Sequence, residues 1–281
     1  MNDNFSPEEI DPIAQAAVQL GELAMHFGRI DRTCVAHPDG TPESDTDHTV
    51  MLAWVAPALA DLLNVRYGFN KYPTGKVAQF AVVHDACEVY AGDTPTIRIS
   101  AAELESKEER EKAATDQLNV QFRRSLPWFA QWVVAYERQW DPCARFVRSV
   151  DKIMPKIVHV INRAEDLFRA QMSLADFEAL YIRQRNQIAE WCPEPLLLHV
   201  YDALCSQVIT MYGSPVVAHV FVVESNREPH LEHNDCEYEL LHNCPVQIAF
   251  DLFLNTNMET LKPGRYEVTA DMIGQLIFNG R

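Results

Sequence analysis

The stretch VVHDACEVYAGDTPT, residues 82–96, decides what kind of fold this sequence can adopt. His84 and Asp85 follow directly on the apolar run FAVV, and Glu88 comes one helical turn later. The apolar spacing predicts a helix over about residues 75–91, with His84 and Glu88 on its core-facing side and Asp85 beside them. Ionisable groups in a core cost several kcal/mol unless they are paired or bind a metal. The stretch therefore requires partners from elsewhere in the chain.

Two other predicted helices offer such partners. One runs from about Asp47 to about Val65, with His48 on its apolar stripe and an expected kink or break at Pro57. The other runs from about residue 143 to 170, with Asp151 in the middle of its apolar face. A single buried His or Asp is usually a satisfied core residue. Two imidazoles and two carboxylates from three helices favour a divalent transition metal, which neutralises both Asp and accepts both His.

The sequence motifs around these residues resemble those of a known family. The order His48, His84-Asp85, Asp151 is similar to the H…HD…D signature of the HD-domain metal-dependent phosphohydrolases. ESDTDHTVMLA, HDACEVYAGDTPT and SVDKIMPK resemble the bacterial HD-domain 5′-deoxynucleotidases over roughly residues 20–210. The resemblance implies an HD-domain helical bundle and one divalent ion, Mn, Co, Fe, Zn or Mg. It also implies that His48, His84, Asp85 and Asp151 bind that ion.

The resemblance assigns further roles within the same stretch. It implies that Glu88 is the general acid or base and that Asp93, in the GDTPT loop, lies near the sugar of the substrate. Asp93 is nearly as well explained as a turn residue beside Gly92. Dinuclear relatives insert additional histidines before the last Asp, but the chain has none between His84 and Asp151, which favours a mononuclear site.

A phosphate substrate also needs cations from the protein. The nucleotidases hold the nucleotide with an Arg-Trp pair upstream of the first His, and the matching place here is Arg32-Thr33, with Arg29 close by. The missing Trp puts a preference for deoxyribose in doubt, because a bulky ring there would crowd a 2′-hydroxyl. Lys152, next to Asp151, is a further candidate for binding phosphate. Arg29 and Lys152 are explained about equally well as ordinary surface cations.

The remaining sequence predicts a mainly α fold with a small β-rich C-terminal module. Helices are expected from residue 7 and over 101–124, 173–191 and 195–212, and a loop over 31–46. After residue 213, β-branched and aromatic runs separated by turns predict strands, so we divide the chain into residues 1–213 and 214–281. The segment HLEHNDCEYELLHNC, residues 230–244, carries three His and two Cys but matches no strong zinc pattern.

Composition limits the partners. The net charge of −16 argues against a nucleic-acid polymer, whose binding needs basic patches. Seven scattered cysteines without a CxxC pair indicate reduced thiols in a cytoplasmic protein. The acidic N-terminus is unlike a signal peptide, and no apolar run approaches membrane-spanning length. The tryptophans among helical apolar positions, together with the resemblance, make a homodimer plausible.

Together these features predict a metal-dependent phosphohydrolase that removes the 5′-phosphate from a (deoxy)nucleoside monophosphate, a small-molecule nucleotide, by metal-activated water. A deoxynucleoside triphosphohydrolase is the nearest alternative within the same class. A non-enzymatic binding protein on a degenerate HD scaffold, with the C-terminal module carrying the function, is the alternative from another class. The completeness of the ligand set and Glu88 favours the enzyme.

Overall fold

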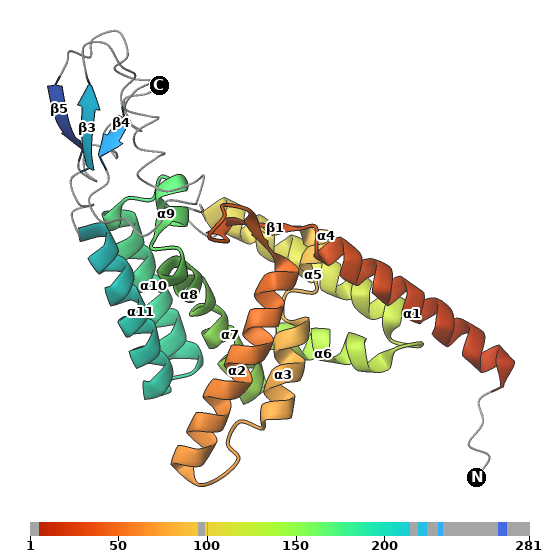
Figure 1. The fold of residues 1–281 in the computed structure, drawn as a ribbon. Helices are drawn as coiled ribbons and strands as arrows, with labels where there is room; N and C mark the ends of the chain where they lie inside the picture. Colours follow the sequence, from red (N-terminus) through yellow and green to blue (C-terminus); the bar gives the residue numbers. More distant parts are fainter. Residues whose placement is uncertain are drawn as a thin grey trace.

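The computed structural model describes residues 6–94, 99 and 101–213, and the strand residues 219–223, 230–232 and 264–268. Residues 6–94 and 101–213 contain eleven helices and one two-stranded hairpin. Figure 1 shows how the helices are arranged. The mainly α architecture expected from the sequence is therefore present in this part of the chain.

A β-hairpin connects the first two helices. Helix α1 (Pro7–Phe27) begins at Ser6, whose backbone NH donates to Glu9 Oε2 at 2.8 Å. Strands β1 (Asp31–Ala36) and β2 (Pro42–Ser44) then pair antiparallel, where the sequence predicted a loop over 31–46. That prediction was wrong because the strands are short and the segment carries Pro and Gly, which are typical of loops.

Helix α2 (Asp45–Tyr67) begins directly after the hairpin. The hydroxyl of Ser44 caps it by accepting the backbone NH of Asp47 at 3.2 Å, so it starts two residues before the predicted Asp47. The helix runs unbroken across Pro57, so of the expected kink or break the break is absent. Its composition would suit a membrane span, yet it packs against α3 and α7 with Asp45 and His48 fully buried.

The predicted helix over residues 75–91 is two helices. Helix α3 (Thr74–Val83) ends before His84, and α4 (Glu88–Ala91) begins after a turn over residues 84–87. Apolar residues continue through the turn, so the periodicity alone does not reveal the interruption. His84 and Asp85 consequently lie at a helix junction.

The predicted long helix over residues 143–170 is divided into three. Helix α7 (Pro142–Asp151) ends at Asp151, and α8 (Met154–Ile161) and α9 (Glu165–Arg169) follow. Arg163 and Ala164 take positive φ values of 52° and 63°, which separates α8 from α9. Neither residue is a glycine or a proline, so the sequence carries no ordinary sign of this break.

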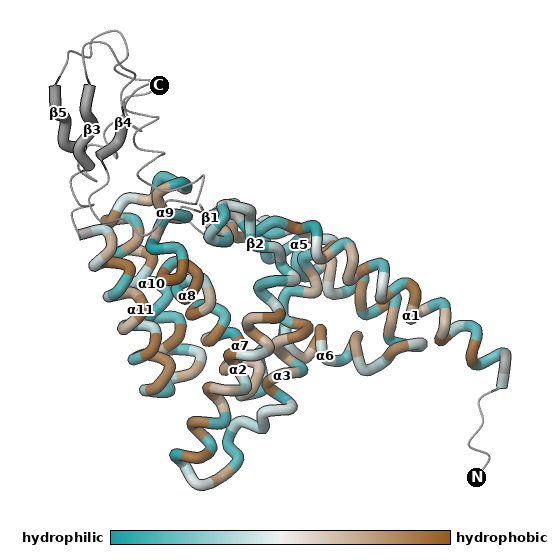
Figure 2. Tube along the Cα trace, in the orientation of Figure 1, coloured by the Kyte–Doolittle hydropathy of each residue, from teal (hydrophilic) through white to brown (hydrophobic). Residues whose placement is uncertain are grey.

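The other helices agree with the predicted ranges. Helix α5 (Ala101–Phe122) carries the charged segment, and α10 (Leu174–Trp191) and α11 (Pro195–Gly213) contact each other. A further helix, α6 (Pro127–Arg138), was not predicted from the sequence. Hydrophobic residues recur along α2, α10 and α11 in Figure 2. The core they share contains Leu52, Phe80, Phe146 and Val147.

The tryptophans divide between core and surface. Trp132 packs edge-on against Phe80, with ring centroids 4.6 Å apart. Trp54 and Trp140 are 74% and 77% exposed. Trp132 therefore packs in the core, whereas Trp54 and Trp140 lie outside it.

Three strands are described after residue 213. They are β3 (His219–Val223), β4 (His230–Glu232) and β5 (Gly264–Val268), and they pair antiparallel in the order β4-β3-β5. The other residues of 214–281 lie outside the described part, including those that follow β4 in the His- and Cys-containing segment. The domain boundary at residue 213 and the module as a whole stay predictions.

Candidate metal centre

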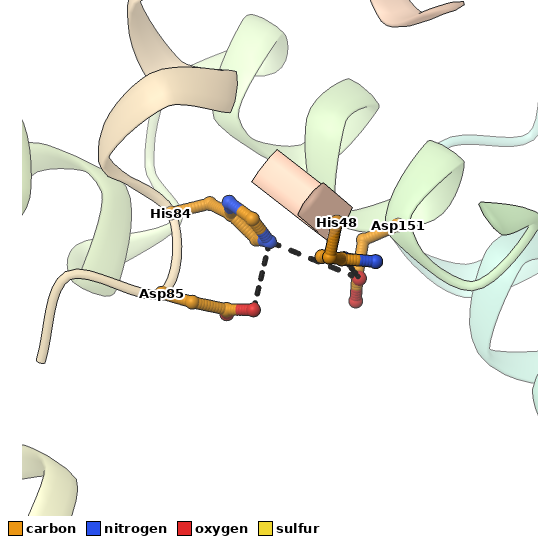
Figure 3. A group of neighbouring side chains, drawn as sticks. All are labelled: His48, His84, Asp85 and Asp151. Atoms are coloured by element: carbon orange, nitrogen blue, oxygen red, sulfur yellow. Dashed lines mark hydrogen bonds and ion pairs between the residues drawn. The ribbon is translucent and has the colours of Figure 1, made fainter. Parts of the chain in front are cut away.

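Four ionisable side chains from three places in the chain meet at one point. His48 comes from α2, His84 and Asp85 from the junction after α3, and Asp151 from the last residue of α7. One ligand atom from each lies within 4.8 Å of all the others, and Figure 3 shows the two imidazoles and two carboxylates converging. The helices predicted to carry these residues thus bring them together, even though two of those helices are interrupted.

His84 directs a ring nitrogen at the carboxylates of the cluster. Its Nδ1 donates to the carbonyl of Ala81 at 2.9 Å, which leaves Nε2 facing the cluster. That Nε2 is buried and lies 2.8 Å from Asp85 Oδ2 and 4.0 Å from Asp151 Oδ1. A nitrogen this close to carboxylate oxygens carries either a proton or a metal ion, so His84 is placed as a metal ligand would be.

His48 faces the cluster from the opposite helix. Its Nε2 lies 2.9 Å from Asp151 Oδ1, its Nδ1 lies 3.1 Å from Glu43 Oε1, and its ring centroid is 5.2 Å from that of His84. Burial opposes a charged His48, but the hydrogen bonds with Asp151 and Glu43 outweigh it and raise its pKa. Without a metal, a proton on Nε2 therefore occupies the position that a metal ion would take.

The two carboxylates are held ionised. Burial opposes their charge, but Lys152, His48 and His84 keep the pKa of Asp151 well below its usual value. His84 and Arg32 likewise lower the pKa of Asp85 against the effect of burial. Two carboxylates and two imidazole nitrogens suit a divalent transition metal by donor chemistry. The residues present therefore fit the metal that the sequence predicted.

A second group of carboxylates adjoins the first. Oxygens of Asp45, Asp85 and Glu88 also lie within 4.8 Å of one another, and Asp85 belongs to both groups. Burial, followed by repulsion from Asp85, raises the pKa of Glu88 to about 11 and that of Asp45 to about 6. Arg32 partly neutralises the group, because its Nη1 lies 3.0 Å from Asp85 Oδ2 and 3.4 Å from Asp45 Oδ1.

The predicted substrate-binding residues do not all reach this place. Arg32 contacts both carboxylate groups, and Lys152 Nζ donates to Asp151 Oδ2 at 2.8 Å. The negative charge of Asp93 lies close enough to raise the pKa of both Arg32 and Glu88. Arg29 is exposed just after α1, and no hydrogen bond or ion pair within the described ranges joins its side chain to the cluster.

Three further residues near the cluster were not singled out from the sequence. Glu43 and Asp45 are buried beside it, although they fall in the segment 31–46, which the sequence predicted to be a loop. Lys107 is half-buried on α5 and pairs with Glu111 at 3.2 Å. Burial opposes its charge, but Glu111, Glu88 and Asp85 outweigh burial and raise its pKa. The first two stand within five residues of His48 in ESDTDH, which is the only signal that could have indicated them.

The histidines outside the cluster have structural surroundings. His159 is buried on α8 and lies 2.7 Å from Asp166 Oδ2 through its Nδ1, while burial lowers its pKa. His199 is exposed on α11. Neither residue belongs to the group of four possible metal ligands.

Comparisons with known proteins agree on one family. The HD-domain family model matches residues 29–194, more than half of the chain. The chain is 44% identical over 54 residues to a 5′-deoxynucleotidase of Erwinia tasmaniensis, covering 19% of this chain and 27% of that protein. It is 39% identical over 56 residues to a 5′-deoxynucleotidase of Vibrio parahaemolyticus, covering 20% of this chain and 28% of that protein. Each alignment thus spans less than a third of the relative.

A solved structure shares the fold. The crystal structure of a predicted metal-dependent phosphohydrolase from Magnetospirillum magnetotacticum superposes with a TM-score of 0.54 at 21% sequence identity. The superposition covers 71% of this chain and 97% of that one. At this identity the likeness concerns the fold alone.

Proposed function

Because this chain belongs to the HD-domain family, we propose that it is a metal-dependent phosphohydrolase that removes the 5′-phosphate from (deoxy)nucleoside monophosphates. The observation that carries the proposal is the convergence of four buried or half-buried donors, in which His84 Nε2 lies 2.8 Å from Asp85 Oδ2. We take His48, His84, Asp85 and Asp151 as the four ligands of one divalent ion.

The ion would supply two kinds of chemistry when bound. It would polarise a phosphoryl oxygen and would lower the pKa of a water that can attack phosphorus. The four residues would hold it with two neutral and two negative donors, which balance its charge formally, so cations of the protein are needed as well to attract a phosphate.

Glu88 is the proposed proton-transfer residue. Its carboxyl lies within 4.8 Å of an Asp85 oxygen and is almost completely buried. It can take a proton from the attacking water or give one to the leaving 5′-alcohol. Either role leaves the ion bound when Glu88 is changed.

Two cations are proposed to bind the phosphate. Arg32 presents a guanidinium that already contacts Asp85, so a phosphate bound to the metal site would lie within reach of its other nitrogens. Lys152 brings an ammonium to Asp151 from the other side of the cluster. Asp93 is the proposed contact to the sugar, and Arg29, being exposed and apart from the cluster, has the weakest support of the four.

The substrate is proposed from the partial relatives. Both carry the name 5′-deoxynucleotidase, and their alignments with this chain are short. The name supports a nucleoside monophosphate with no indication of the base. Thr33 stands at the place where the resemblance to the HD-domain 5′-deoxynucleotidases implies a Trp, so we expect weaker discrimination against a 2′-hydroxyl than a bulky ring would give.

The proposal is tested by metal analysis of the purified protein and a panel of nucleotides. Nucleoside mono-, di- and triphosphates, each as ribose and deoxyribose forms, are incubated with Mn²⁺, Co²⁺, Mg²⁺ or Zn²⁺. Release of inorganic phosphate from a monophosphate supports the proposal. Release of inorganic triphosphate would instead identify a triphosphohydrolase. If no nucleotide releases any phosphate species, the enzyme proposal fails and a binding protein on an HD scaffold takes its place.

A further inference from the structure

Glu43 lies behind one of the two histidines of the cluster. It is the middle residue of β2, only 1% exposed, and its Oε1 lies 3.1 Å from Nδ1 of His48. The other ring nitrogen of His48 faces Asp151 at 2.9 Å. A neutral imidazole carries its proton on one nitrogen and a lone pair on the other. A carboxylate at Nδ1 therefore keeps the proton there and directs the Nε2 lone pair into the cluster.

The two histidines are oriented by different acceptors. His84 donates its Nδ1 hydrogen to the carbonyl of Ala81, a neutral acceptor three residues earlier, in α3. His48 instead uses a full carboxylate from a separate element. A carboxylate draws the Nδ1 proton more strongly than a carbonyl does, which increases the electron density on Nε2 and its strength as a ligand. The metal affinity of the cluster should therefore depend on Glu43 through His48.

Structural stability alone does not explain a carboxylate at this position. Oε2 of Glu43 is buried and has no hydrogen-bond partner in the described part of the chain, and Arg32 approaches the other oxygen only to 3.8 Å. A buried carboxylate with an unsatisfied oxygen is costly. The hairpin nevertheless holds it next to His48 through the pairing of Asp31 with Ser44.

We infer that Glu43 is a positioning residue that fixes the tautomer and orientation of His48 and so sets the metal affinity of the site. The hairpin thus contributes to the centre from both strands, with Arg32 from β1 and Glu43 from β2. The inference rests on the proposed function only in taking the cluster as a metal centre. It does not depend on the identity of the substrate.

The experiment measures metal binding directly. Metal-free wild type, Glu43→Gln and Glu43→Ala are titrated with Co²⁺ alone against a competing chelator, and the visible spectrum of bound Co²⁺ is recorded. We expect Glu43→Ala to raise the Kd about 10–100-fold and to change the Co²⁺ spectrum. Glu43→Gln should raise it less, because an amide oxygen still accepts from Nδ1. The Gln variant also preserves the size of the side chain, so the test survives if the Ala variant fails to fold.

Glu194→Gln is the matched control. Glu194 is also a buried glutamate, but its hydrogen bonds go to Tyr67, Lys71 and Tyr72. Its change should lower thermal stability and leave the Kd for Co²⁺ and the spectrum unaltered. An unchanged Kd and spectrum in both Glu43 variants would overturn the positioning role alone. Absence of Co²⁺ binding by wild type would overturn the metal centre itself, and the positioning role with it.

Discussion

Asp85 is the residue at which the two carboxylate groups of the site meet. Its oxygens belong both to the group with His48, His84 and Asp151 and to the group with Asp45 and Glu88. It also contacts Arg32 Nη1 at 3.0 Å. A residue shared in this way links the proposed metal ligands to the proposed proton-transfer and phosphate-binding residues. Its removal should therefore affect all three at once.

We expect Asp85→Ala to lose both the bound metal and activity. The change removes one of four proposed ligands and leaves the Arg32 guanidinium beside an incomplete site. Metal content by elemental analysis should fall to background and turnover by at least about 100-fold. Asp116→Ala, an exposed Asp on α5, is the control and should retain both. Full metal content in Asp85→Ala would show that the ligand set is wrong.

Glu88→Gln should separate chemistry from metal binding. The amide cannot transfer a proton, so we expect kcat to fall about 10²–10⁴-fold while the metal content stays near that of wild type. Steady-state kinetics and elemental analysis on the same preparation measure both quantities. Retention of full turnover would remove Glu88 from the mechanism. Loss of the metal would place Glu88 among the ligands instead.

The residues of the site differ in how far the sequence reveals them. His48 and Asp151 interrupt apolar stripes, so their polarity conflicts with their surroundings and demands an explanation. Glu43 and Asp45 lie in a polar segment, where an acidic residue is expected to be exposed and gives no sign of a site. Their burial arises from the hairpin, which brings that segment against α2, and the sequence pattern gave no indication of pairing there.

At the scale of elements, the site is built where helices end. Helix α3 stops before His84, and α7 stops at Asp151, so three of the four proposed ligands stand at helix ends, whereas His48 lies in the first turn of the continuous helix α2. Apolar periodicity predicted the faces correctly because the side chains on both sides of each interruption still point to the core. It could not predict the interruptions, since the one after α8 depends on positive φ at Arg163 and Ala164.

The loop after α4 is attached to α5 by one arginine. Arg110 donates from Nη1 to the carbonyl of Ala91 at 2.7 Å and from Nη2 to Thr94 Oγ1 at 2.8 Å. These two acceptors lie on either side of Asp93, the proposed contact to the sugar. The arginine therefore fixes the position of Asp93 without belonging to the metal centre.

We expect Arg110→Ala to weaken substrate binding more than catalysis. Loss of the attachment costs about 1 kcal/mol, which corresponds to roughly a fivefold rise in KM, with kcat changed less and metal content unaltered. Steady-state kinetics on the best nucleotide of the panel measures the two constants. Lys112→Ala, an exposed cation on the same helix, controls for the loss of charge. A fall in kcat with constant KM would contradict a role in positioning the sugar contact.

At the scale of the whole molecule, the cluster joins parts of the chain that are far apart in sequence. His48 and Asp151 are separated by 103 positions, and His84 lies on a third element between them. A metal that binds only the folded arrangement stabilises it by about 4 kcal/mol at a free concentration of 1,000 times the Kd. The same buried charges oppose folding when no metal is present, so metal and pH should act on stability together.

We expect the metal-free protein to lose stability as pH rises from 5 to 9. The pKa of Glu88 is raised from its ordinary value of 4.5 to about 11, so the stability it contributes is complete below pH 4.5 and is lost as pH rises toward 11. Asp45 acts in the same direction up to its pKa of about 6, and the raised pKa of His48 has the same sign. The lowered pKa values of Asp85 and Asp151 cost stability only as pH falls below about 3.8, outside this window.

Thermal unfolding with a chelator and with saturating Mn²⁺ measures this effect. In chelator, Glu88 alone should lower the free energy of unfolding by about 1 kcal/mol per pH unit, or roughly 2–4 °C in Tm. Bound metal neutralises the carboxylates and needs them deprotonated, so the Tm difference between the two conditions should widen with pH. Glu88→Gln removes the main titrating group and should flatten the decline in chelator. A Tm difference that stays constant from pH 5 to 9 would mean that the buried carboxylates do not hold their protons in the metal-free fold.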